Sequence, residues 1–278
     1  MPIIFNSLLE QYGVTANTVI LLRHQDGSAD RGRTPYELWR DDRPAFDVYQ
    51  RLQGIKNRAK FSQSNFWASF VGTLDGATMF VGMYAAKYMG PLAEDTPNPH
   101  NDGINLAGSC DCYDLQLDKR FSDLQGKLFI EWGDGKLAWI QRAGNQNKAV
   151  VELRPEFKEP EFPGFLNFIE PLSKIEALPA TWTVMLKQAA GVYLLTCPKT
   201  KEQYVGSASG ADGFWNRWCQ YASNNHGGNV SLKSREYSDY QVSILEVAGS
   251  ASTWKDILEM ESRWKKKLQS REMGLNKN

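Results

Sequence analysis

The sequence predicts an α+β fold with two domains: a β-rich N-terminal domain built on a curved sheet or small barrel, and a C-terminal domain that mixes strands and helices. Three observations support this prediction. Two Asp-Gly pairs interrupt aromatic and β-branched runs in the first half of the chain. A proline-dense stretch follows, and beyond it short apolar runs alternate with segments whose apolar residues have helical spacing.

The composition excludes several classes of protein. The 278 residues include 9 Trp, 11 Tyr and 13 Phe, which supply far more buriable surface than a disordered chain carries. No apolar run approaches the ~18 to 20 residues of a membrane span, and the first residues lack the features of a signal peptide. We therefore expect a cytoplasmic protein with no membrane partner. The formal net charge is zero, but cations outnumber anions from Thr181 onward, which is compatible with a polyanionic partner.

The spacing of the four cysteines also fits a cytoplasmic protein. Cys110 and Cys112 flank one residue, too close for an easy disulfide, while Cys197 and Cys219 stand alone. No second ligand pair is spaced for zinc. Reduced thiols are therefore expected.

The N-terminal part reads as strand-rich with one helix. The run Thr18–Leu22 is expected as a strand and Pro44–Gly54 as a helix. Asp-Gly between apolar runs is the strongest short-range hairpin signal, so hairpins are expected at 66–86, with Asp75-Gly76 as the turn, and at 128–140, with Asp134-Gly135.

Prolines divide the chain. Pro155, Pro160, Pro163, Pro171 and Pro179 remove backbone donors and fix φ, so neither a long helix nor a central strand is expected there. We predict a β-rich domain at 1–154, a linker at 155–180 and a second domain at 181–278.

The second domain begins with a predicted hairpin. Residues 191–196 form the first strand, and the second strand begins at Gln203. A loop centred between Pro198 and Lys199 would place Tyr193 opposite Tyr204, so the two phenols would share one face of the sheet.

Helices and a further strand follow this hairpin. A helix over 212–223 would place Arg217 and Tyr221 one turn apart. A strand over 240–247 and a helix capped by Ser252 or Thr253 come next. An apolar stripe on that last helix contains Trp254, Ile257, Glu261, Trp264 and Leu268.

Glu261 is the exception in the stripe. A carboxylate on an apolar face is costly to bury unless it is paired or binds a metal. Taken singly, these residues also have ordinary interpretations: Glu261 as half of a rim ion pair, Arg217 as a solvated charge or a salt bridge, and each tyrosine as a core aromatic.

Taken together and in this order, the residues resemble the GIY-YIG nuclease family. Gly191-Val192-Tyr193 corresponds to the first triplet and Tyr204-Val205-Gly206 to the second, with Val in place of Ile in both. Arg217 then falls on the first helix, Glu261 on the later helix, and Asn276 near the C-terminus. The resemblance covers roughly the last third of the chain.

The resemblance implies a three-stranded antiparallel sheet flanked by helices, and hydrolysis of phosphodiester bonds with one divalent metal. Glu261 would hold Mg²⁺ or Mn²⁺, because these hard ions prefer oxygen ligands. Arg217 would neutralise charge on the scissile phosphate. Tyr193 would deprotonate or orient water, with its pKa lowered by nearby cations, and Tyr204 and Tyr221 would assist.

Two further residues are assigned to the substrate by resemblance. His226, in a Gly-rich loop, could bind phosphate or act as an acid, with an ordinary loop histidine as the alternative. Asn276 could contact substrate or hold the tail beside the site. Ser207 stands where some members carry a lysine that aids water activation, so such a helper would have to come from elsewhere.

The N-terminal domain is the expected selector of DNA. Its curved sheet faintly resembles PUA-like barrels, some of which hold flipped modified bases. Arginines mix with Tyr36, Trp39 and Tyr49, which suits phosphate contact and base stacking, although acidic neighbours also allow an ordinary solvated surface. The arginines are Arg23, Arg31, Arg33, Arg40, Arg43 and Arg51.

The sequence therefore predicts a metal-dependent DNA endonuclease, with restriction or defence as the expected setting and modified DNA as a possible target. A repair or recombination nuclease is the nearer alternative. A non-catalytic nucleic-acid-binding protein that keeps the fold is the alternative from another class. Cleavage of both strands by one active site per chain would suggest a homodimer, although the sequence shows no interface.

Overall fold

The computed structural model describes residues 3–25, 32–101, 103–133, 138–224 and 238–276. The chain divides into two compact units, Met1–Lys158 and Glu159–Asn278, and each is described by itself. No described helix has the length and apolar character that a membrane crossing requires.

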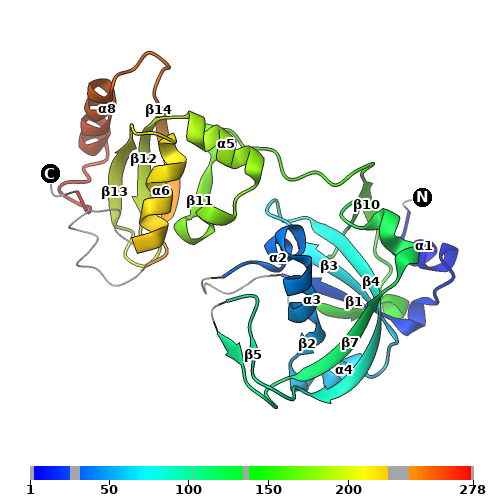
Figure 1. The fold of residues 1–278 in the computed structure, drawn as a ribbon. Coiled ribbons are helices and arrows are strands. Elements are labelled where there is room, and N and C mark those ends of the chain that lie inside the picture. The colour runs from blue at the N-terminus through cyan, green and yellow to red at the C-terminus, as the bar shows by residue number, and fades with distance from the viewer. Residues whose placement is uncertain (1–2, 26–31, 102, 134–137, 225–237, 277–278) are drawn as a thin grey trace. The chain divides into compact units, whose positions relative to one another are not determined.

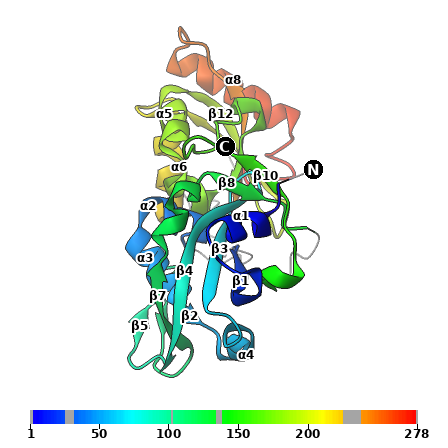
Figure 2. The ribbon, with the colours of Figure 1, turned by 90° about the vertical axis from the view of Figure 1, so that its right-hand side faces the viewer.

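The first unit is a curved sheet with helices on it (Figures 1 and 2). The sheet runs β10-β8-β4-β3-β1-β9, and β7 pairs with both β4 and β2. The strands are β1 (Val19–His24), β2 (Leu52–Gln53), β3 (Phe66–Gly72), β4 (Thr78–Pro91), β5 (Thr96–Pro97), β6 (Ile104–Asn105), β7 (Asp111–Leu117), β8 (Leu128–Ile130), β9 (Ile140–Arg142) and β10 (Val150–Leu153). The helices are α1 (Phe5–Gln11), α2 (Pro35–Asp41), α3 (Arg43–Arg51) and α4 (Arg58–Phe61).

The first predicted hairpin is confirmed. Strands β3 and β4 pair antiparallel from Phe66↔Ala85 to Gly72↔Thr78. Asp75-Gly76 lies in the turn, where Gly76 has a φ of 82°, a value that favours glycine. The long β4 then continues past β3 and pairs with β7, which curls the sheet (Figure 2).

The second predicted hairpin is wrong. The strands on either side of Asp134-Gly135, β8 and β9, do not pair with each other; the turn itself lies outside the described residues. β8 already has β4 on one edge and β10 on the other, so β9 pairs instead with β1. A local turn signal could not reveal that competition between strands.

Helix α2 is an element that the sequence prediction missed. Its local signal is Thr34-Pro35, followed by Glu37: the Thr34 side chain accepts from the Glu37 N–H, and the Glu37 carboxylate accepts from the Thr34 N–H. Pro35 occupies the first turn, where its missing N–H costs nothing.

Alternation along β1 sends its side chains into two of the core clusters of the first unit. On β1, Val19 and Leu21 point into a cluster with α1, while Ile20 and Leu22 point to the other face with Phe61 of α4. Both faces of this strand are therefore buried, which explains its continuous apolar run.

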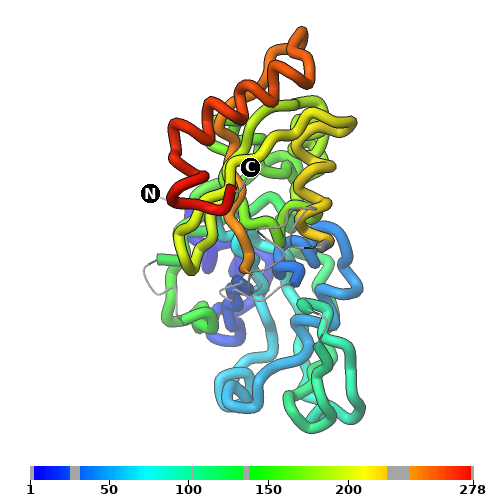
Figure 3. Tube along the Cα trace, turned by 90° about the vertical axis from the view of Figure 1, so that its left-hand side faces the viewer, coloured from blue at the N-terminus to red at the C-terminus, as the bar shows by residue number. Residues whose placement is uncertain are grey.

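The second unit is a three-layer arrangement around a small antiparallel sheet (Figures 1 and 3). Its strand order is β11-β14-β12-β13, so β13 lies at an edge. The strands are β11 (Ile169–Pro171), β12 (Gly191–Thr196), β13 (Gln203–Ala208) and β14 (Gln241–Val247), and the helices are α5 (Ala180–Gln188), α6 (Gly213–Asn224) and α8 (Trp254–Lys267). The three expected strands are present, and the short β11 adds a fourth.

Helices cover both faces of this sheet. On one face, Trp218 of α6 packs in a cluster with Tyr193 and Tyr204. On the other face, Ile257 and Met260 of α8 pack against Val192 and Val205. The orange and red α8 and the yellow α6 accordingly lie on opposite sides of β12 and β13 (Figure 1).

Much of the proline-rich stretch expected as a linker packs into this second unit. Phe168, Leu172, Ile175 and Leu178 belong to the same core cluster as Trp218. The Phe168 ring stacks on Trp218 with centroids 5.2 Å apart. This stretch has neither a long helix nor a central strand, as its prolines predict, but it forms the short edge strand β11 and its apolar side chains contribute to a core.

Candidate active site

The β12–β13 hairpin brings the two triplets together in a register that differs from the prediction. Tyr193 pairs with Gly206, and Tyr204 pairs with Leu195. The loop occupies residues 197–202, closed by a bond from the Cys197 N–H to the Glu202 carbonyl, so its centre lies one residue later than expected. The register shift is two residues, which preserves the face, and both phenols still point toward α6.

Gly206 is required by the close approach of Tyr193. A Cβ placed on Gly206 would lie 2.5 Å from the Tyr193 hydroxyl oxygen and 2.6 Å from its Cζ. Any other side chain would displace the ring, which is fully buried. The glycine that ends the second triplet therefore positions the tyrosine of the first.

Arg217 and Tyr221 meet Tyr193 from α6. The Tyr193 hydroxyl donates to the Tyr221 oxygen at 3.1 Å. Arg217 donates from Nε to the Tyr193 oxygen at 3.3 Å and from Nη2 to the Tyr221 oxygen at 3.2 Å. Two arms of one guanidinium thus hold two phenol oxygens, and the phenols in turn fix the orientation of the guanidinium.

Burial raises the pKa of Tyr193, and the nearby Arg217 charge offsets only part of this effect. The pKa of Tyr221 is also raised, chiefly by burial. The expectation that cations lower the tyrosine pKa is therefore wrong, because removal from water outweighs the attraction of one guanidinium. At neutral pH both groups are protonated hydroxyls that donate and accept hydrogen bonds.

Glu261 lies on α8, on the other face of the sheet. Thr253 caps this helix with Asp256, as one of the two predicted caps. The Ser207 hydroxyl donates to one Glu261 oxygen, and the Lys265 ammonium lies 2.7 Å from the other. Ile257 of the predicted stripe is buried, but Trp254 is 59% exposed.

The predicted residues therefore form two groups on either side of one strand. Tyr204 and Gly206 face α6, whereas Val205 and Ser207 face α8, because successive residues of a strand alternate. Tyr193, Tyr221 and Arg217 are in direct contact with one another, and Glu261 is not on their face of the sheet. Both groups adjoin the edge strand β13 where Gly206 is followed by Ser207.

Asn276 holds the tail against β13. Its side-chain oxygen accepts from the Val205 N–H at 2.9 Å, and its amide nitrogen donates to the Val205 carbonyl at 2.8 Å. The side chain is buried, so both ends of its amide serve the fold rather than a substrate. His226, the other residue assigned to substrate by resemblance, lies outside the described residues.

Comparison with known families agrees with this geometry. Residues 189–276 match the GIY-YIG catalytic domain family. This part of the chain is a GIY-YIG domain. Domains of this family are DNA endonucleases, and they generally depend on a divalent metal. Searches among curated proteins and among solved structures gave no match to the chain.

A metal in the GIY-YIG domain would have few protein ligands. No group of three or more His, Cys, Asp or Glu side chains in the described ranges is placed to hold a metal. Glu261 is half-buried with a serine hydroxyl beside it, and such a site fits Mg²⁺, which keeps several waters and binds through one or two carboxylates.

Outside the GIY-YIG domain, much of the arginine-aromatic segment is used internally. Tyr36 and Trp39 are core residues and cannot stack on bases, contrary to expectation. Arg33 pairs with Asp42, and Arg40 forms a two-armed bond with Asp41. In the sequence these aspartates only reduced the local positive charge. In the structure they are the ion-pair partners of the arginines.

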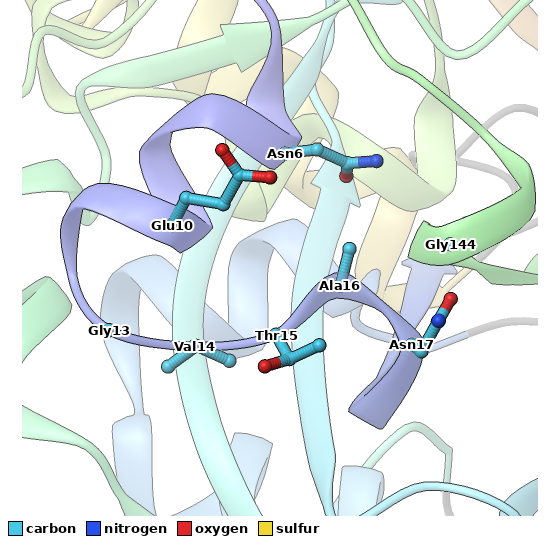
Figure 4. Close-up of a pocket in the computed structure, with 8 residues that line it drawn as sticks. All are labelled: Asn6, Glu10, Gly13, Val14, Thr15, Ala16, Asn17 and Gly144. Carbon is cyan, nitrogen blue, oxygen red and sulfur yellow. The ribbon is translucent and has the colours of Figure 1, made fainter.

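The first unit also has a hollow of about 530 Å³ (Figure 4). Small and polar residues line it: Asn6, Glu10, Gly13, Val14, Thr15, Ala16, Asn17 and Gly144. Among the described residues of its wall, Glu10 alone carries a charge. An anionic wall does not favour a phosphate backbone.

Proposed function

We propose that the protein is a divalent-metal-dependent DNA endonuclease whose active site straddles the edge of β13 at Gly206 and Ser207. The observation that carries the proposal is the cluster of Tyr193, Tyr221 and Arg217, hydrogen-bonded at 3.1 to 3.3 Å within the segment that matches the GIY-YIG catalytic domain. In the described sheet β13 is the edge strand, and the tail bonds to it at Gln203 and Val205, so a DNA strand would lie beyond the tail, at Gly206 and Ser207, where side chains from both faces adjoin the edge.

Arg217 would neutralise the developing charge on the phosphate. The phenols already fix its guanidinium, so little reorganisation is needed when charge develops. Tyr193 is fully buried and its raised pKa keeps it protonated, so it would act as a hydroxyl that holds the Arg217 guanidinium in place. Tyr204, which is 7% exposed and whose ring lies 6.4 Å from that of Tyr221, would position the attacking water.

Glu261 would hold Mg²⁺ or Mn²⁺. The bound cation would supply Lewis-acid stabilisation of the phosphate. Ser207 would keep the carboxylate pointed toward the edge through the bond to its second oxygen.

Nicking of supercoiled plasmid tests the catalytic role. We expect Mg²⁺-dependent nicking by the wild type and a loss of about 10² to 10³ in rate for Glu261→Ala. Glu259→Ala, at an exposed position on the same helix, is the matched control and should nick normally. Equal nicking by Glu261→Ala and wild type would refute the assignment. DNA binding without any nicking in either metal would support the non-catalytic alternative.

For the biological setting, we propose restriction or defence, with the first unit selecting the DNA and modified bases as its possible target. The proposal is supported by the presence of a separate β-rich unit in the same chain as a nuclease domain that is small on its own. Digestion of unmodified, methylated and hydroxymethylated phage DNA, with sequencing of the ends, tests it. Equal cutting of all three DNAs would refute selection of modified bases, and preference for branched or damaged DNA would favour repair or recombination.

A further inference from the structure

The ion pair between Glu261 and Lys265 is close and mostly buried. The two residues are one helical turn apart on α8, and their charged atoms are 2.7 Å apart. The Lys265 side chain is 6% exposed and that of Glu261 13% exposed. Most exposed helical pairs of this spacing contribute little and are screened by solvent, but this pair is largely shielded from water.

Both oxygens of the Glu261 carboxylate are already engaged. Lys265 holds Oε1, and the Ser207 hydroxyl donates to Oε2. On the same helix face, Ile257 and Met260 pack against the sheet, so the carboxylate borders an apolar cluster. A negative charge in such surroundings needs a positive partner, and Lys265 provides it when no metal is bound.

A divalent cation on Glu261 would compete with this ammonium. A metal bound to Oε1 would take the position of Nζ, and a metal bound to Oε2 would place charges of +2 and +1 within a few ångströms in a partly dry site. Like charges at that separation repel strongly when water does not screen them. When a metal binds, the Lys265 ammonium must therefore move away, or its repulsion of the ion weakens the binding.

We propose that Lys265 is a displaceable counter-ion of Glu261: it holds the carboxylate in its orientation in the metal-free protein, and it lowers the affinity of the site for divalent cations. This inference rests on the proposed function, in which Glu261 is the metal ligand. Lys265 is then a positioning residue, and its displaced ammonium becomes available to an incoming anion such as a DNA phosphate.

Measuring the binding of Mn²⁺ to the full chain tests the inference without a cleavage assay. The free Mn²⁺ is monitored by electron paramagnetic resonance. Lys265→Met removes the charge and keeps the apolar stem, and we expect Mn²⁺ to bind about tenfold more tightly. Lys266→Met changes the neighbouring exposed lysine and should leave the affinity unchanged. Glu261→Ala should abolish this binding. Thermal unfolding provides a second readout, since Mn²⁺ should raise the Tm of Lys265→Met more than that of the wild type.

The outcomes separate the two proposals. If Glu261→Ala loses the Mn²⁺ but Lys265→Met binds it no more tightly than wild type, the counter-ion inference is overturned and the metal site stands. If neither wild type nor Lys265→Met binds Mn²⁺, both are overturned. Should Lys265→Met not fold, Lys265→Gln, which keeps a donor but no charge, should show the same tightening, and its absence there would overturn the inference.

Discussion

Substitution of Gly206 by alanine tests the packing that positions the tyrosine cluster. The new Cβ would lie 2.5, 2.6 and 2.9 Å from the Oη, Cζ and Cε2 atoms of Tyr193. Contacts under 3.0 Å do not persist, so the ring must shift by several tenths of an ångström. The Tyr193 ring is fully buried and lies edge-on to Trp218, so there is little room for that movement.

Overpacking of this kind costs about 1 to 3 kcal/mol. The clash lies on a described β-strand at a position where glycine has no positive φ, so the cost is steric rather than conformational. A shifted phenol would also lengthen its bonds to Arg217 and Tyr221, now 3.3 and 3.1 Å. We therefore expect a less stable second unit and slower nicking.

Hydrogen exchange of the β12 and β13 amides at neutral pH measures the local stability. Exchange should be about 5- to 150-fold faster in Gly206→Ala than in wild type, as the free-energy range implies. Gly210→Ala is the matched control, since no atom lies within 4 Å of its added Cβ. In a Tyr193→Ala background the cost of Gly206→Ala should vanish, because the clash partner is gone. Unchanged exchange in Gly206→Ala, or an equal cost in both backgrounds, would refute the steric reasoning.

Three further predictions follow from the same domain. Arg217→Lys should reduce nicking by about 10²-fold while the fold persists, because an ammonium cannot hold two phenols and a phosphate in one plane; near-normal nicking would contradict this. Asn276→Ala should cost about 1 to 3 kcal/mol, seen as faster exchange in β13, because the buried Val205 N–H and carbonyl lose their partners; wild-type exchange would count against it. Burial raises the pKa of Tyr193 above its ordinary value of 10, so the unfolded chain loses this proton first and the free energy of unfolding should fall as pH rises above about 10. Tyr193→Phe should reduce that slope in urea unfolding, and an unchanged slope would show that Tyr193 does not carry the effect.

Local signals predicted many elements of the fold. Asp75-Gly76 marks a turn that forms through short-range geometry alone, and the predicted hairpin is present. Helical spacing placed Arg217 and Tyr221 on one face, and they share one partner, Tyr193. Asp134-Gly135 has the same local signal, yet its flanking strands pair elsewhere, because pairing in a sheet is decided by which strand edges are free.

The sequence predicted which residues belong to the candidate site better than it predicted how they are arranged. Nothing in the order of Glu261, Ser207 and Lys265 along the chain indicates that one residue of β13 and one turn of α8 enclose a single carboxylate. The pKa of Tyr193 was expected in the wrong direction, since the sequence shows a neighbouring cation but not the depth of burial.

The sequence by itself determined the residues of the GIY-YIG domain, their order and the faces of the helices and strands that carry them, because these depend on spacing and on the fixed periods of helix and strand. Only the tertiary structure decided that the guanidinium of Arg217 and the carboxylate of Glu261 approach β13 from opposite faces, and that Lys265 accompanies the carboxylate. Those outcomes depend on which layers pack together and how much water they exclude, and such properties arise only when distant parts of the chain are in contact.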